Sequence, residues 1–306
     1  MMQATGASPP LSEAEPRGIP TRLEFLRPAH GIVNVAHVVA THALLATWLW
    51  VSWRVLSIAA YVPLGVLACL IHQRAMSEWI HEGAHFNLVK NRRWNDALTN
   101  LLACVWFGIT VDDYRSTHFP HHAKDAFFVA DDGDTVFLEI GSRREFWRAM
   151  VGDLAGLTFL EQYRRLKAGG RGRSAGSWAL TLGVQASLVV LLLRLGRIDM
   201  YVIYYATLGL LYPLLNRIRV YGQHVSIDRD GHSHFAESAA SRTIDAGFFD
   251  RVLVTSPRLL YHHEHHRWPH LPYRALAGLC VPSADVNSYA RSRFAVLRAI
   301  YRGLPV

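Results

Sequence analysis

Long apolar stretches alternate with long polar stretches along this chain of 306 residues. Four of the apolar stretches are nearly free of charged side chains: Ile32–Val51, Leu56–His72, Trp178–Leu195 and Met200–Leu215. Each is about long enough to cross a hydrocarbon core as a helix, because roughly 17–25 residues suffice. Only a few residues separate the members of each pair, near Ser52–Val55 and at Gly196–Asp199. The pattern therefore predicts two transmembrane hairpins.

Two other segments have apolar positions at helical spacing. Ala97–Val111 is apolar but short, and it is more typical of a re-entrant or interfacial helix than of a span. Glu145–Lys167 places its apolar residues on one face, and Arg and Lys flank that face. This second pattern predicts a helix lying in the membrane interface, and a helix packed on the water-facing part fits it equally well.

The composition agrees with a membrane unit that carries a sizeable water-facing part, since 51% of the residues are apolar and 18% are charged. The three cysteines, Cys69, Cys104 and Cys280, are far apart, so neither a disulfide framework nor a thiolate metal site is expected. The chain has 29 Arg and only 3 Lys, a bias typical of a GC-rich genome, and we expect a bacterial source.

The distribution of Arg and Lys predicts the orientation in the membrane. The segment from Arg74 to Ser177 holds 14 of these residues, the chain after Leu215 holds 12, and the N-terminal tail holds 3. Only Arg54, Arg194 and Arg197 lie at the two tight turns. The positive-inside rule then places both termini and both large polar segments in the cytoplasm, at a bacterial inner membrane. Because topology accounts for the net charge of +8, nucleic acid is not expected as a partner.

The sequence thus predicts an all-α membrane protein: four transmembrane helices in two hairpins, with a cytoplasmic helical cap. The expected divisions are a mobile N-terminal tail (1–31), the first hairpin (32–72), a cytoplasmic segment (73–177), the second hairpin (178–215) and a second cytoplasmic segment (216–306).

Histidine is unusually frequent, at 17 residues, and eight of these form three clusters in the predicted cytoplasmic segments. The clusters are His81 and His85, then His118, His121 and His122, and then His262, His265 and His266. Residues four apart on a helix share one face. Imidazole suits Fe, Cu, Ni and Zn. A catalytic zinc needs three protein ligands, so eight converging histidines are too many for one ion and suit two.

The order and spacing of these clusters resemble the three histidine boxes of the membrane fatty acid desaturase and hydroxylase superfamily. The resemblance extends from about Ile32 to Pro272 and includes the hairpins. It implies a di-iron centre with O₂ as co-substrate, and a ninth ligand, His224, after the second hairpin. The implied metal ligands are His81, His85, His118, His121, His122, His224, His262, His265 and His266. His263 breaks the shared spacing and is expected to support the site without binding metal.

The polar neighbours of the boxes have expected roles as well. Carboxylates that accept the free N–H of a liganding imidazole are common around metal sites. The candidates for this role are Glu82, Asp132, Asp134 and Glu264. The other histidines are expected to be structural or interfacial: His30, His37, His42, His72, His232, His234 and His270.

The resemblance implies a desaturase that introduces a double bond into a fatty acyl or related lipid chain. A hydroxylase or ketolase of a lipid or carotenoid fits the boxes equally well, and a zinc-dependent membrane hydrolase is a distant alternative. The chain has no His-Pro-Gly-Gly motif of a fused cytochrome. Electrons are therefore expected from a separate ferredoxin, rubredoxin or cytochrome with its reductase. Val62–Cys69 and Tyr201–Tyr212 are candidates to line a channel for the lipid.

Overall fold

The fold was analysed in a computed structural model. It describes residues 24, 26–122, 134–169, 175–228, 230–234, 241–245 and 247–305. Helices dominate this part of the chain, which confirms the predicted helical fold class. The strands form two small sheets: β1 (Ser226–Ile227) pairs antiparallel with β2 (Ser233–His234), and β3 (Thr243–Ile244) pairs parallel with β4 (Tyr289–Ala290). Most of the predicted tail lies outside the described residues.

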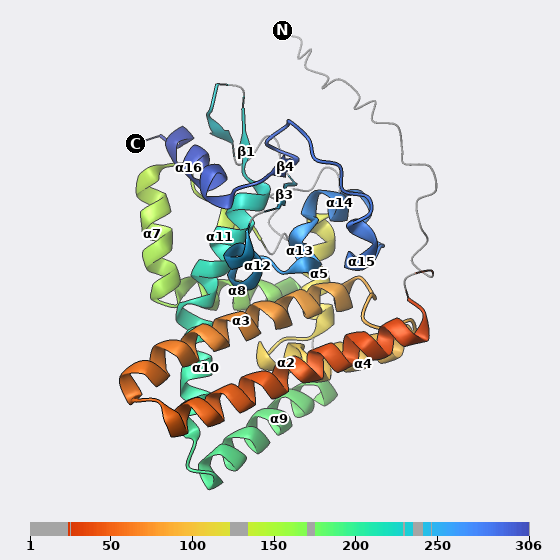
Figure 1. Ribbon diagram of the computed structural model, residues 1–306, viewed down its shortest axis with the longest axis vertical. Helices are drawn as coiled ribbons and strands as arrows, with labels where there is room; N and C mark the ends of the chain where they lie inside the picture. The colour runs from red at the N-terminus through yellow and green to blue at the C-terminus, as the bar shows by residue number, and fades with distance from the viewer. Residues whose placement is uncertain are drawn as a thin grey trace.

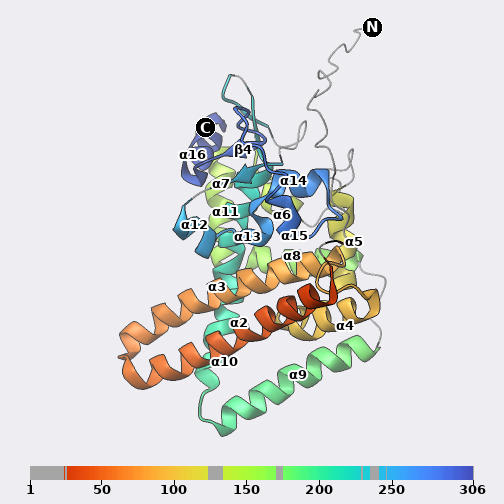
Figure 2. The same ribbon diagram turned by 45° about the vertical axis from the view of Figure 1, so that its right-hand side comes forward.

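The longest helices are α2 (Pro28–Val55) and α3 (Ile58–Ala84), which pack side by side as an antiparallel pair (Figures 1 and 2). Helix α9 (Ala175–Arg194) lies beneath α2 and leads into α10 (Ile198–Leu210) (Figure 1). Three helical segments of the described chain are long and apolar enough to cross a membrane: Pro28–Val55, Ile58–Ala84 and Ile198–His224. The apolar part of α9, Trp178–Arg194, is shorter.

Helix α3 continues well beyond the apolar stretch that ends at His72. Beyond that point the helix is almost entirely buried, and its buried residues include polar ones such as Gln73 and Glu78. At a rise of about 1.5 Å per residue, His81 lies about 13 Å beyond His72 along the helix axis. The first histidine box therefore lies at the end of the same helix as the second apolar stretch.

A break at Leu211 divides the fourth apolar stretch. Helix α10 stops at Leu210, and α11 (Tyr212–His224) begins at once with Pro213 in its first turn. Proline is tolerated there because a backbone N–H in the first turn has no carbonyl acceptor within the helix, so proline costs no hydrogen bond. The apolar stretch was expected to end at Leu215, but α11 continues the helical path up to His224.

The segment Glu145–Lys167 differs from the prediction of one helix. It contains most of two helices, α7 (Arg143–Leu154) and α8 (Leu157–Gly169). Between them Gly156 has φ +77°, a left-handed conformation that favours glycine and ends α7. A Cβ on Gly156 would lie 3.5 Å from the Gly209 carbonyl oxygen, an ordinary contact, so the backbone conformation and not the packing against α10 favours glycine here.

The segment Ala97–Val111 is likewise divided. Helix α4 (Arg92–Leu102) is followed by the 3₁₀ turn η1 (Cys104–Trp106), and Val111 begins α5 (Val111–His121). None of these elements is long enough to be counted among the candidate spans, as expected.

The remaining elements build a compact cap of short pieces above α3 (Figure 1). They are α6 (Thr135–Leu138), α12 (Phe248–Leu253), α13 (Pro257–Leu260), α14 (His262–Arg267), α15 (Tyr273–Leu276) and α16 (Arg293–Gly303). One core of the cap lies between α6, α11 and α16, where Phe137, Val220 and Ile300 are buried. A buried ion pair joins α11 to α7: Arg217 Nε donates to Asp153 Oδ2 at 2.7 Å.

Candidate metal centre

The last turn of α3 presents two histidines, His81 and His85, four residues apart. Gly83 lies between them and allows α4 to approach closely. A Cβ on Gly83 would come within 2.2 Å of Thr99 Oγ1 and 2.4 Å of Thr99 Cγ2. The Asn95 amide also donates to the Gly83 carbonyl oxygen at 2.7 Å. Helix α4 therefore fixes the end of α3 from behind the two imidazoles.

Helix α5 carries the second box, with His118 and His121 in its last turn and His122 at its C-cap. A capping box begins the helix: Thr110 Oγ1 accepts from the Asp113 N–H at 3.0 Å, and Asp113 Oδ2 accepts from the Thr110 N–H at 2.9 Å. These bonds satisfy two backbone N–H groups that lack helical partners.

Replacing Thr110 with valine keeps the shape of the side chain and removes the cap. We expect the free energy of unfolding to fall by about 0.5–2 kcal/mol. Thermal or denaturant unfolding of the purified protein measures this change. Thr47→Val is a matched control, since Thr47 is exposed on α2 and caps no helix. Equal stability of the two variants would contradict the capping role.

The third box lies on α14, which carries His262, His265 and His266, while His224 is the last residue of α11. The chain before α14 is tied to α3 through Glu78. This buried carboxylate accepts from the Ser256 N–H at 2.9 Å and lies 3.6 Å from Arg258. Glu78 lies three residues before His81 on α3. Its contacts with Ser256 and Arg258 therefore hold α14 close to the first box.

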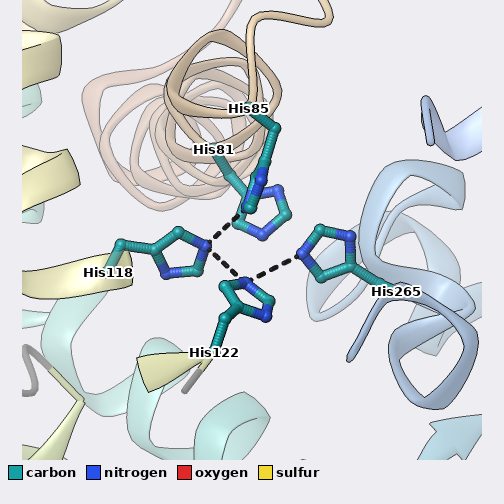
Figure 3. Close-up of side chains that lie close together, drawn as sticks. All are labelled: His81, His85, His118, His122 and His265. Carbon is teal, nitrogen blue, oxygen red and sulfur yellow. Dashed lines mark hydrogen bonds between the residues drawn. The ribbon is translucent and has the colours of Figure 1, made fainter. Parts of the chain in front are cut away.

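Five imidazoles converge in a first cluster, the five-histidine group, seen in Figure 3. It consists of His81, His85, His118, His122 and His265. One ring nitrogen of each lies within 4.8 Å of one ring nitrogen of every other member. The Nε2 atom of His118 is 2.9 Å from His85 Nε2 and 3.0 Å from His122 Nε2. His265 Nε2 is 3.2 Å from His122 Nε2.

The other four predicted ligands form a second cluster, the four-histidine group: His121, His224, His262 and His266. His224 Nε2 lies 3.2 Å from His121 Nε2 and 2.7 Å from His262 Nε2. The ring centroids of His121 and His122 are 5.7 Å apart, so the two groups are neighbours. All nine predicted residues are thus brought together, in two sets.

Burial favours the neutral form of imidazoles in the five-histidine group. Burial lowers the pKa of His85 to about 3, with the nearby Arg115 cation adding to the effect. Burial and neighbouring imidazoles lower the pKa of His122 to about 2 and that of His265 well below its usual range. Uncharged imidazole is the form that ligates a metal, so no proton has to be displaced near neutral pH.

The donor geometry also fits bound cations. An ion held at about 2.1 Å by two imidazoles at right angles would place their nitrogens about 3.0 Å apart, as observed here. His81 is only 2% exposed, and neither of its ring nitrogens has a hydrogen-bond partner among the described residues. A buried imidazole left without partners is costly, and a metal ion would satisfy it.

The carboxylates predicted to support the ligands have several contacts in the described chain. Glu82 Oε1 is 3.8 Å from His81 Nδ1, beyond hydrogen-bond length. Glu264 accepts from Thr243 Oγ1, and Asp134 lies 3.8 Å from Arg219. Asp132 lies outside the described residues.

His263 does not join either histidine group of the described chain. Its Nδ1 atom lies 2.8 Å from the Ser241 carbonyl oxygen, and its backbone N–H donates to Thr243. These bonds are consistent with the supporting role predicted for it.

A second pairing of histidines was not foreseen. His42 Nδ1 lies 2.8 Å from His72 Nε2, and His72 Nδ1 lies 3.1 Å from the Tyr204 hydroxyl. The pair forms because α2 and α3 pack side by side with these two residues at the same level, and it agrees with the structural role expected for both. The sequence did contain a signal for this pair. His42 and His72 lie at similar distances before and after the short turn that joins the two helices of the hairpin.

Two cavities lie along α3 and the apolar helices. The larger, of about 490 Å³, is mostly apolar and lies between α2, α9 and α10. It includes Tyr201 and Tyr204 of the predicted lining, whereas the stretch Val62–Cys69 contributes none of its lining residues. The smaller cavity, of about 70 Å³, is lined by residues that include Ser77, Ile80 and Tyr212.

Residues 56–279 match the fatty acid desaturase family, and the chain belongs to that family. The resemblance indicated by the histidine boxes is therefore confirmed. The chain is also similar to the dihydrorhizobitoxine desaturase of Bradyrhizobium elkanii. The two are 27% identical over 289 aligned residues, which cover 84% of this chain and 76% of that protein. Together these findings make the chain a desaturase-like oxidoreductase.

Proposed function

We propose that this protein is a membrane di-iron desaturase that uses O₂ to introduce a double bond into a fatty acyl or related lipid chain. The observation that carries the proposal is the convergence of nine histidines, from α3, α5, α11 and α14, into two adjacent groups. Desaturation removes two hydrogens from the substrate. O₂ is reduced to two waters with two further electrons and two protons.

Each histidine group would hold one iron. The five-histidine group offers more ligands than a zinc site uses, and a second complete set lies beside it, which disfavours a single zinc. When bound, the irons supply the reduction of O₂ and the oxidation of an unactivated C–H bond. The chain itself contributes burial that excludes water, and fixed imidazoles that keep the ligand field neutral.

The two cavities suggest a route for the lipid chain. His72 lines the large apolar cavity, and Ile80, about 12 Å further along α3, lines the small one beside His81. An acyl chain lying in the large cavity would then extend toward the five-histidine group. Trp106 lines the large cavity, and its neighbour Phe107 lines the small one. Their rings would narrow a passage that leads from one cavity to the other.

The topology we propose has four spans in two hairpins, with both termini and the histidines on the cytoplasmic side of a bacterial inner membrane. The Arg and Lys distribution supports this orientation. Exposed apolar side chains on α7 and α8 support contact of these helices with the membrane interface, since Trp147, Val151 and Leu157 are 58%, 65% and 62% exposed. Electrons would come from a separate ferredoxin, rubredoxin or cytochrome with its reductase.

Desaturation is preferred over hydroxylation or ketolation for one reason. The relative that matches most of the chain is named a desaturase. The histidine geometry itself suits all three reactions, so the product has to be determined directly.

The test is expression in a host that lacks the gene, followed by mass spectrometry of its lipids and metal analysis of the purified protein. We expect a product two hydrogens lighter than its precursor and about two irons per chain. A product heavier by one oxygen would replace the desaturase with a hydroxylase. One zinc per chain and no dependence on O₂ would refute the oxidoreductase mechanism.

A further inference from the structure

A third cavity opens directly onto the five-histidine group. It has a volume of about 320 Å³, and its walls include His85, Phe86, Arg92, Phe119, His122 and His270. We propose that the surface around this cavity is the docking site for a small acidic electron-transfer protein. This inference rests on the proposed function, because only an O₂-reducing enzyme needs such a donor.

The inner end of the cavity consists of candidate metal ligands. His85 and His122 both belong to the five-histidine group, and both line the cavity. By contrast, His81 and His265 are 2% and 1% exposed. A donor seated over the cavity would therefore face the ligand imidazoles at the side where they come nearest to water.

Exposed basic residues lie in and next to the segments that line the cavity. Arg92 is part of its wall, and Lys90 and Arg93 are exposed close to Arg92 in the sequence. Arg267 is exposed at the end of α14, shortly before the lining residue His270. The nearby carboxylates Asp96 and Asp112 are already engaged, since both form ion pairs with Arg115. The surface is therefore complementary to an acidic protein, and charges of this kind accelerate the encounter.

Aromatic rings lie between the rim and the ligands. Phe119 is 42% exposed, and its ring centroid is 5.6 Å from that of His85. Phe86 has φ +60°, a conformation that a bulky residue rarely adopts. The guanidinium groups of Arg92 and Arg115 hold its ring, at 4.7 Å and 4.0 Å from the centroid. Backbone strain of this kind concentrates at functional sites.

The character of this surface favours a protein donor over the lipid chain as occupant. The cavity lies at the end of α3, more than a dozen residues beyond its apolar part, and its rim is charged. The apolar cavity suited to a lipid chain is a different one, between α2, α9 and α10. Small, transient redox complexes use such charged rims around a limited contact area.

The test compares two electron sources in detergent-purified, iron-loaded protein. One source is a plant-type [2Fe–2S] ferredoxin with its NADPH reductase, and the other is dithionite with methyl viologen. We expect Arg92→Glu/Arg93→Glu to lower the ratio of ferredoxin-driven to viologen-driven turnover by about tenfold, and to weaken its dependence on salt. The control Arg298→Glu alters an exposed arginine on α16 and should leave this ratio unchanged.

Two results would overturn the inference while leaving the function intact. An unchanged ratio in Arg92→Glu/Arg93→Glu would place the donor elsewhere. An equal loss with both electron sources, accompanied by a raised KM for the lipid, would assign the surface to the substrate. Absence of iron and of viologen-driven turnover in the unaltered protein would refute the proposed function itself, and the docking site with it.

Discussion

Replacing His265 with alanine is expected to abolish turnover and to lower the iron content of the purified protein. The imidazole belongs to the five-histidine group, with its Nε2 3.2 Å from His122 Nε2 and its ring centroid 4.4 Å from that of His81. Removing it deletes a proposed ligand and leaves buried imidazoles without a partner. His121→Ala should have the same result through the four-histidine group, where His121 Nε2 lies 3.2 Å from His224 Nε2.

The matched control is His263→Ala, which alters a histidine of the same box that belongs to neither group. Its ring contacts Ser241, so this variant should retain iron. Iron is measured per chain after purification, and turnover is measured from the lipid product. All three variants should insert into the membrane normally. Full activity of either His265→Ala or His121→Ala would count strongly against a shared di-iron centre.

The second large effect is expected at Gly83, between the two histidines of α3. An added Cβ would lie 2.2 Å from Thr99 Oγ1, so Gly83→Ala must push α3 and α4 apart. Overpacking of this kind costs about 1–3 kcal/mol. It also displaces His81 and His85, and a displacement of about 1 Å at a catalytic site can lower the rate about 100-fold. We therefore expect loss of iron together with loss of activity.

Gly183→Ala is the matched control for this substitution. Gly183 lies within α9 and a Cβ there would meet nothing within 4 Å, so the variant should be as stable as the parent or slightly more stable. Adding Thr99→Ala to Gly83→Ala removes the two closest contacts, at 2.2 and 2.4 Å, and should restore part of the iron content. Normal iron content and activity in Gly83→Ala alone would show that the two helices need not pack so closely.

The sequence alone predicted which histidines converge, but not how they are divided. Successive residues on a helix differ by about 100° in direction, so the neighbours His121 and His122 point into different groups. The same rotation separates His265 from His266. The division depends on how α5 and α14 face each other in space. No spacing within a single box carries that information.

Other differences have local causes. The apolar spacing of Glu145–Lys167 was compatible with one helix, and only the positive φ of Gly156 shows where it divides. A glycine inside a helical pattern is ambiguous, because a helix can also continue through it. Helix α3 extends past His72, the end of the second apolar stretch, to the first box.

The interleaving of the two groups has a consequence for assembly. Helix α5 contributes to both groups, through His118 and His122 to one and His121 to the other, and α14 is shared in the same way. Ordering either helix around a first iron would preform part of the cradle for a second. Loading would therefore be cooperative, and a chain holding a single iron should be a scarce intermediate between the empty and the full protein.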